Sequence, residues 1–242
     1  MIDELKENKK AGGNSTTLWC WAILPHLVRG SIFWLGILGY GVQLIYKAAL
    51  IAGPMIWRTR QDEKLSWNSV WPIKEPLPSK KVWIYSLLSA VIFSGSAIFT
   101  ITFFHEMLGV DPNVLKSEFD SLFSLTTPIA VGLVLYLFTI NAALEELHFR
   151  AWLDVELSSR YGNWVGVFVS SNLFAAMHMF IFAGMEGVSV LSMGLVYLSL
   201  VIAGVTWSMF RRVPGGIHAA WLSHGLTDAV LLTWGLFWLG YF

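Results

Sequence analysis

The sequence has only one cysteine, Cys20, and little charge of either sign. One cysteine permits no intramolecular disulfide and no cysteine-based metal cluster, and packing is its expected role. Charged residues make up 13% of the 242, with 16 basic and 16 acidic side chains, so no basic field points to nucleic acid. Residues 1–17 are polar and lack the short basic start and prompt apolar core of a secretory signal, so we expect a loose tail there.

Apolar residues dominate the chain. They make up 55% of it, with 13 Trp and 16 Phe, and the mean hydropathy is +0.60. This composition indicates an integral membrane protein whose surroundings are the lipid bilayer and whose partners are membrane-borne. A span needs roughly 20 largely apolar residues. Six runs qualify, which predicts an all-α polytopic bundle of about six transmembrane spans: Ser31–Trp57, Val82–Phe104, Thr126–Arg150, Gly162–Ala183, Val188–Phe210 and Ile217–Phe242.

The regions between the spans indicate an orientation. The stretch from Trp19 to Arg29 is broken by Pro25 and is expected to be a short interfacial helix. The loop from Arg58 to Lys81 holds six basic residues, whereas the loop from His105 to Leu125 holds one. The positive-inside tendency places the first loop on the cytoplasmic side. The membrane is expected to be the cell membrane (inner or plasma membrane). Alternation of the spans then puts Arg160, Arg211 and Arg212 on the same side.

Few polar groups lie inside the apolar runs, and acidic groups there cost several kcal/mol unless they are paired, protonated or facing water. They are Glu145, Glu146, His148, Arg150, His178, His224 and Asp228. Residues four apart share one face of a helix, so Glu146 can pair with Arg150, and His224 lies on one face with Asp228. Glu145 has phenylalanine four positions on and is therefore expected to be unpaired and free to face a cavity.

One unpaired carboxylate, two imidazoles and a further aspartate on three helices can hold and activate a water molecule. A buried carboxylate beside a histidine can act as a general base, and the other histidine can stabilise the oxyanion that forms when a carbonyl is attacked. The pattern therefore favours an intramembrane hydrolase.

Three spaced motifs carry a family resemblance. EExxxR (Glu145, Glu146, Arg150), FxxxH (Phe174, His178) and HxxxD (His224, Asp228) occur in this order on successive apolar runs. Together they resemble the CPBP family, which comprises type II CAAX prenyl endopeptidases and the bacteriocin-processing or immunity-type Abi proteins. The resemblance covers residues 126–242, whereas the first 125 residues carry no diagnostic residue. We expect a tail at 1–17, membrane helices with the basic loop at 18–125, and a catalytic core at 126–242.

The resemblance implies a glutamate-dependent endopeptidase without metal or other cofactor, whose site opens to the cytoplasm and whose substrate is a membrane-associated peptide or a prenylated protein. Glu145 and His178 would activate water, and His224 with position 228 would form the oxyanion site. Glu146, Arg150 and Phe174 would support the motifs. The family commonly has asparagine where this chain has Asp228. An ionised aspartate donates no hydrogen bond, so Asp228 could instead orient His224 and keep it charged.

Other interpretations remain open. Glu145 could be a solvated acid at the end of a span, and each histidine could be a core histidine bonded to a carbonyl. The Glu145–His148 spacing occurs in di-iron bundles, and Glu145, His178 and His224 could be zinc ligands. A non-catalytic immunity or scaffold protein is the alternative within the family. A proton-relaying transporter is a third candidate, although no inverted repeat is visible. Span boundaries also create a conflict: a span starting at Gly162 would place His178 about 24 Å along its helix, away from Glu145 near a span end.

Overall fold

The computed structural model describes residues 15–34, 40–59, 75–122, 125–182 and 188–242. All regular structure in these ranges is helical, which confirms the all-α prediction. The predicted tail, except for its last three residues, and most of the basic loop at 58–81 lie outside the described ranges.

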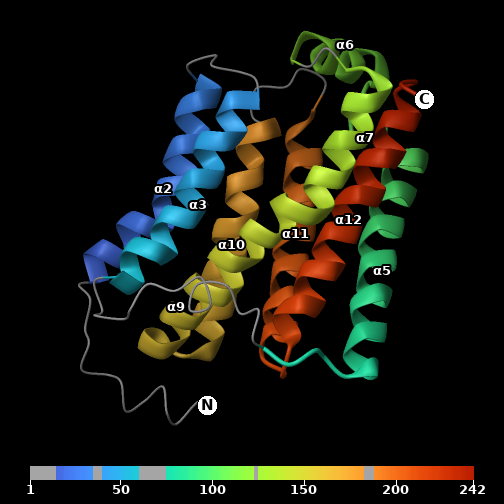
Figure 1. Cartoon of the computed structure of the whole chain (residues 1–242). Coiled ribbons are helices and arrows are strands. Elements are labelled where there is room, and N and C mark those ends of the chain that lie inside the picture. The colour runs from blue at the N-terminus through green and yellow to red at the C-terminus, as the bar shows by residue number, and fades with distance from the viewer. Residues whose placement is uncertain (1–14, 35–39, 60–74, 123–124, 183–187) are drawn as a thin grey trace.

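The N-terminal region forms two helices, α2 (Ser15–Trp34) and α3 (Tyr40–Thr59), which pack side by side at one edge of the bundle (Figure 1). The predicted span Ser31–Trp57 is therefore wrong, because its residues are divided between two helices. The supposed short interfacial helix from Trp19 to Arg29 is the middle of α2, which continues through Pro25. Leu18 and Ala22 of α2 are fully buried in the core, which explains why this stretch does not stand alone.

The opposite edge is formed by α5 (Lys80–Phe104), which lies against α12 (Gly216–Trp238), and α10 (Asn163–Phe182) and α11 (Val190–Arg211) lie between the edges (Figure 1). These four helices agree with the predicted runs to within a few residues. Ser79 and Ser189 accept hydrogen bonds from the first-turn amides of α5 and α11, which fixes where these two helices begin.

The third predicted run is part of a longer continuous helix that crosses the bundle obliquely (Figure 1). It comprises α7 (Thr127–Tyr136), a π-helical segment η1 (Leu137–Asn141), α8 (Ala142–Glu146), a second π-helical segment η2 (Leu147–Leu153) and α9 (Asp154–Tyr161). The predicted end near Arg150 is wrong: the polar residues around it are buried inside the fold, so they do not mark the end of the helix. The helix ends at Gly162, whose φ of +99° favours glycine.

Among the described residues, three helices are long and apolar enough to cross a membrane: Lys80–Phe104, Thr127–Tyr161 and Val190–Arg211. A helical membrane bundle is thus supported, whereas six remains a predicted number of spans. The short α6 (Pro112–Leu122) lies between α5 and α7, and Asp120 accepts a hydrogen bond from Tyr241 beyond the end of α12.

The basic residues near the helix ends gather at one end of the bundle. Arg211 forms an ion pair with Glu75 at 3.0 Å, and Arg212 forms one with Asp154 of α9, also at 3.0 Å. Gly215, at φ +69°, lies so close to the 76–78 backbone that an added Cβ would overlap the Pro76 carbonyl oxygen. The segment before α5 and the turns α9–α10 and α11–α12 therefore share one end of the bundle, as the charge pattern predicts.

Candidate active site

Two π-helical segments frame the glutamate pair. In η1 and η2 the backbone bonds close over five residues, as when the Ala142 N–H donates to the Leu137 carbonyl. The single α-helical turn between them carries Glu145 and Glu146. π-Helical turns are rare and often occur at functional sites, because the wider turn redirects side chains. A helical-wheel prediction with a uniform 100° step therefore does not hold along this helix.

Glu145 is buried and ion-paired. One carboxylate oxygen, Oε1, accepts hydrogen bonds from Lys47 Nζ at 2.9 Å and from the Tyr46 hydroxyl at 3.1 Å, and both donors come from α3. The expectation that Glu145 is unpaired is thus wrong. The partner is a cation from a sequentially distant helix, which spacing along one helix does not predict. Glu145 is 1% exposed, so it is also no solvated acid at a span end.

The other oxygen of Glu145 faces two imidazoles. Oε2 lies 3.9 Å from His178 Nε2 and 3.7 Å from His224 Nε2. These separations exceed a direct hydrogen bond, but a single water molecule can bridge atoms so far apart. One carboxylate oxygen of Glu145 is therefore held by α3, and the other points toward the histidines of α10 and α12.

The helix lengths explain why Glu145 and His178 meet. Glu145 lies 16 residues before the helix end at Tyr161, and His178 lies 15 residues after the start of α10 at Asn163. At about 1.5 Å per residue both side chains lie roughly 22–24 Å from the turn that joins the two helices. The conflict expected from the sequence does not occur, because Glu145 lies near the middle of a helix that continues to Tyr161 and not near a span end.

His178 is oriented by its own helix. Its Nδ1–H donates to the Phe174 carbonyl at 2.9 Å, so in the neutral ring Nε2 carries the lone pair that faces Glu145. The Phe174 side chain is fully buried and lies against both His178 and His224, with ring centroids at 4.6 and 5.4 Å. Phe174 thus supplies both the carbonyl that orients His178 and the apolar contact between the two imidazoles.

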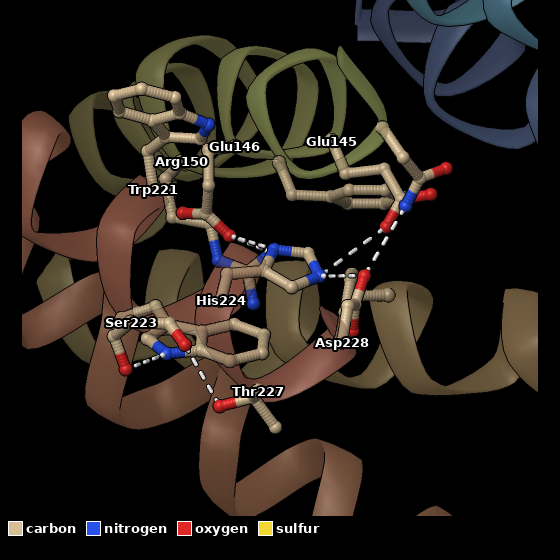
Figure 2. A network of polar contacts seen from close by, with 12 residues as sticks. Glu145, Glu146, Arg150, Trp221, Ser223, His224, Thr227 and Asp228 are labelled. Atoms are coloured by element: carbon tan, nitrogen blue, oxygen red, sulfur yellow. Dashed lines mark hydrogen bonds and ion pairs between the residues drawn. The ribbon is translucent and has the colours of Figure 1, made fainter. Parts of the chain in front are cut away.

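His224 is held on three sides. Its Nδ1–H donates to Glu146 Oε1 at 2.9 Å, and its ring stacks on Trp207 at a centroid distance of 4.1 Å. Its Nε2 lies 3.5 Å from Asp228 Oδ2 (Figure 2). Asp228 also accepts a hydrogen bond from Asn141 Nδ2 at 3.4 Å. The position of His224 is therefore fixed, and only its Nε2 is directed toward Glu145.

The Glu146–Arg150 pair holds His224 in place through Glu146 Oε1, which contacts both His224 and Arg150. The Arg150 guanidinium lies 3.2 Å from Glu146 Oε1, as the i, i+4 spacing predicts, and both side chains are buried. It also lies over the Phe174 ring, 4.3 Å from its centroid. Gly204 of α11 makes room for it, because an added Cβ would come within 2.9 Å of Arg150 Nη2.

His148 takes no part in this cluster. It is fully buried, its Nδ1–H donates to the Leu50 carbonyl at 3.0 Å, and its ring packs against Phe149 and Trp152. It is a core histidine, so the Glu145–His148 spacing carries no di-iron site. Among the residues that the structure describes, no group of three or more His, Cys, Asp or Glu side chains is arranged to hold a metal ion.

Tyr46, Lys47 and Asn141 also belong to the site, although the sequence pattern did not predict them. The available signal for Lys47 was its position in the apolar run LIYKAALIAG, since an ionisable residue inside a membrane segment indicates a function by default. Its side chain is only 6% exposed. Asn141, 7% exposed, precedes Glu145 by one helical turn and carried no signal beyond its polarity.

The fold and the site together define a class: a helical membrane bundle with a buried glutamate and two histidines converging from separate helices. Residues 127–230 match the family model described as type II CAAX prenyl endopeptidase, Rce1-like. This match confirms the resemblance to the CPBP family over that part of the chain. The match supports a CAAX-type intramembrane protease as the kind of function. Neither the curated proteins nor the solved structures contain a match to the chain.

Proposed function

We propose that the protein is a metal-independent intramembrane endopeptidase in which Glu145 and His178 activate water. The observation that carries the proposal is that the two carboxylate oxygens of Glu145 have different partners. Oε1 accepts a hydrogen bond from Lys47 of α3, and Oε2 lies within 3.9 Å of the Nε2 atoms of His178 and His224. A water molecule between Oε2 and His178 Nε2 donates one hydrogen bond to each. Both acceptors then raise the nucleophilicity of its oxygen.

The reaction proceeds as a general-base hydrolysis. The water oxygen bonds to the carbonyl carbon, a water proton passes to Glu145, and the carbonyl π electrons move onto its oxygen. His224 Nε2 lies on the side of Glu145 where the doubly protonated ring, which also donates from Nδ1 to Glu146, can donate to that oxyanion. When the intermediate collapses, the C–N bond breaks and the leaving amine takes the proton from Glu145. The first products are a carboxylic acid, which keeps the second water proton, and an amine; transfer of that proton to the amine leaves a carboxylate and an ammonium, and no cofactor is required.

The proposed substrate is a membrane-associated peptide or a prenylated protein. Glu145 and His224 are almost completely buried, whereas the side chains of Asp228 and His178 are 24% and 17% exposed, so a substrate would reach the site past these two residues. We further propose that the basic end of the bundle faces the cytoplasm, because Arg211 and Arg212 lie there with Lys80 and Lys81.

The test uses purified protein in lipid nanodiscs with a fluorescence-quenched peptide that ends in a prenylated CAAX sequence. In parallel, the proteomes of membranes that contain the wild type or Glu145→Gln are compared. We expect cleavage that depends on Glu145, in the peptide, in the membranes or in both. Absence of any Glu145-dependent product in both experiments would reject the protease and support the non-catalytic family alternative.

A chelation experiment tests metal independence. Activity should persist after exhaustive treatment with a membrane-permeant chelator, and elemental analysis should find no stoichiometric metal. Loss of activity on chelation, with recovery on adding zinc, would instead assign Glu145, His178 and His224 as ligands of a catalytic metal.

A further inference from the structure

Two N–H donors converge on a single carboxylate oxygen beside the proposed base. Asp228 Oδ2 lies 3.4 Å from Asn141 Nδ2 and 3.5 Å from His224 Nε2. The donors come from different helices, since Asn141 ends η1 and His224 belongs to α12. Convergence of two donors on one oxygen anion is the arrangement that stabilises an oxyanion in acyl transfer.

We infer that Asn141 is the second oxyanion donor of this enzyme, beside His224, and that Asp228 Oδ2 lies where the oxyanion forms. The inference rests on the proposed protease function. It assigns a catalytic role to a residue outside all three motifs, and it gives Asp228 the role of a resident anion that the substrate displaces.

The chemistry of the side chains supports this assignment. An ionised aspartate has no proton to donate, whereas the amide of asparagine donates in every protonation state. The Nδ1–H of His224 is engaged by Glu146, so His224 can donate to a substrate only from Nε2, and only as the imidazolium, which carries an N–H on both nitrogens. Asn141 supplies the neutral donor that complements it, and its amide is buried.

The geometry also suits displacement of Asp228. Distances of 3.4–3.5 Å are longer than the roughly 2.7–3.1 Å expected between an oxyanion and its donors. The Asp228 side chain is 24% exposed, against 1% for His224, so the carboxylate can turn toward the open side. His224 Nε2 is 3.7 Å from Glu145 Oε2 (Figure 2). An activated water on Oε2 and the donor pair would therefore lie on adjacent sides of one substrate carbonyl.

Four variants test the inference on the quenched prenylated peptide: Asn141→Ala, Asn141→Asp, Asp228→Asn and the double variant Asn141→Ala/Asp228→Asn. Loss of one oxyanion donor should lower kcat about 100-fold or more with little change in KM, so both Asn141 variants should lose this much. Asp228→Asn replaces the resident anion with a donor and should keep or raise kcat. It should also rescue Asn141→Ala by at least about tenfold, because the amide is restored from the other helix.

The matched control is Asn172→Ala. Asn172 is also a bundle asparagine with side-chain hydrogen bonds, to the Phe168 carbonyl and from Tyr197, but it lies outside the cluster. Its kcat should stay within about threefold of the wild type, a small effect beside the loss expected for an oxyanion donor. Thermal unfolding of every variant separates loss of fold from loss of chemistry, and rescue by Asp228→Asn is not expected of an asparagine that only packs.

The outcomes separate this inference from the proposed function. If Glu145→Gln abolishes cleavage while Asn141→Ala keeps the wild-type kcat, the protease stands and the role of Asn141 is rejected. If Asp228→Asn loses activity as strongly as Asn141→Ala, the Asp228 charge is needed to orient His224, and the displacement model is wrong. If no variant and no wild-type sample yields Glu145-dependent products, the proposed function itself fails.

Discussion

The part of the chain that carries the motifs and the N-terminal helix pair contribute to the site in different ways. All motif residues lie within the matched range 127–230, yet the closest polar partner of Glu145 is Lys47 of α3, at 2.9 Å. The C-terminal part supplies the groups that would react, and α3 supplies the cation that holds one of them. The motifs therefore contain the residues proposed to react but not the residues that fix them in place, and a fragment starting at 126 would lack that cation.

The largest effect is expected in the motif region. Glu145→Gln keeps the size of the side chain and an acceptor for Lys47, but the amide cannot take a proton from water. Cleavage of the prenylated peptide should fall by about 10²–10⁴-fold with the folded fraction unchanged. Glu106→Gln, at an exposed carboxylate beyond α5, is the control. A wild-type rate for Glu145→Gln would remove the base from the mechanism.

The next effect concerns stability, again within the motif region. Arg150→Met leaves the Glu146 carboxylate buried without its guanidinium, which should cost about 3–5 kcal/mol. Arg160→Met breaks an ion pair of the same i, i+4 spacing whose side chains are 20% and 21% exposed, and should cost about 0–1 kcal/mol. Reversible unfolding in mixed micelles measures both. Equal losses would show that burial of the Glu146–Arg150 pair does not matter.

Lys47→Met tests the N-terminal side of the comparison. It leaves Glu145 buried with only the Tyr46 hydroxyl as donor to Oε1, and should cost about 3 kcal/mol. Lys47→Met/Glu145→Gln removes both charges, so it should be more stable than Lys47→Met alone. A double-mutant cycle gives the coupling. Additive losses would mean that α3 contributes packing alone and that the site is complete without it.

The smallest effect lies at the far end of the bundle, away from both regions. The Tyr241 hydroxyl donates to Asp120 at 2.7 Å and, with Lys116, holds the pKa of that carboxyl below its usual value. This stabilisation is present above the unfolded pKa and is lost as pH falls through the folded one. Tyr241→Phe should slightly flatten the acid side of a stability-versus-pH curve and leave cleavage unchanged. An altered cleavage rate would couple α6 to the site.

The sequence predicted the helical class and the boundaries of α5, α10, α11 and α12 well, because each is a long apolar run between polar or glycine-containing breaks. It also predicted the Glu146–Arg150 pair from spacing alone. The division between α2 and α3 was missed, since residues 31–57 are apolar enough to be taken for one span. The end of the third run was misplaced because Glu145, Glu146 and Arg150 were taken to mark an interface, although their charges are neutralised inside the fold.

Contacts between helices could not be predicted from a sequence pattern along one helix. The ion pair between Lys47 and Glu145 depends on how α3 packs against the middle of another helix. The convergence of Asn141 and His224 on Asp228 depends on how α12 packs beside η1. The π-helical turns were likewise not predicted, because nothing in LFTIN or LHFRAWL differs from an ordinary helical sequence.

The helical segments 145–161 and 163–178, on either side of Gly162, have nearly equal lengths, so the number of residues between the first two motifs determines whether Glu145 and His178 meet. Glu145 lies 16 residues before the end of the first segment at Tyr161, and His178 lies 15 residues after the start of the second at Asn163. The two side chains stay at the same height along the bundle only while these two lengths are kept. A single insertion in α9 would raise one side chain by about 1.5 Å and turn it by about 100° relative to the other. Natural variants of this protein should therefore tolerate substitutions along the exposed face of α9 but not changes in its length.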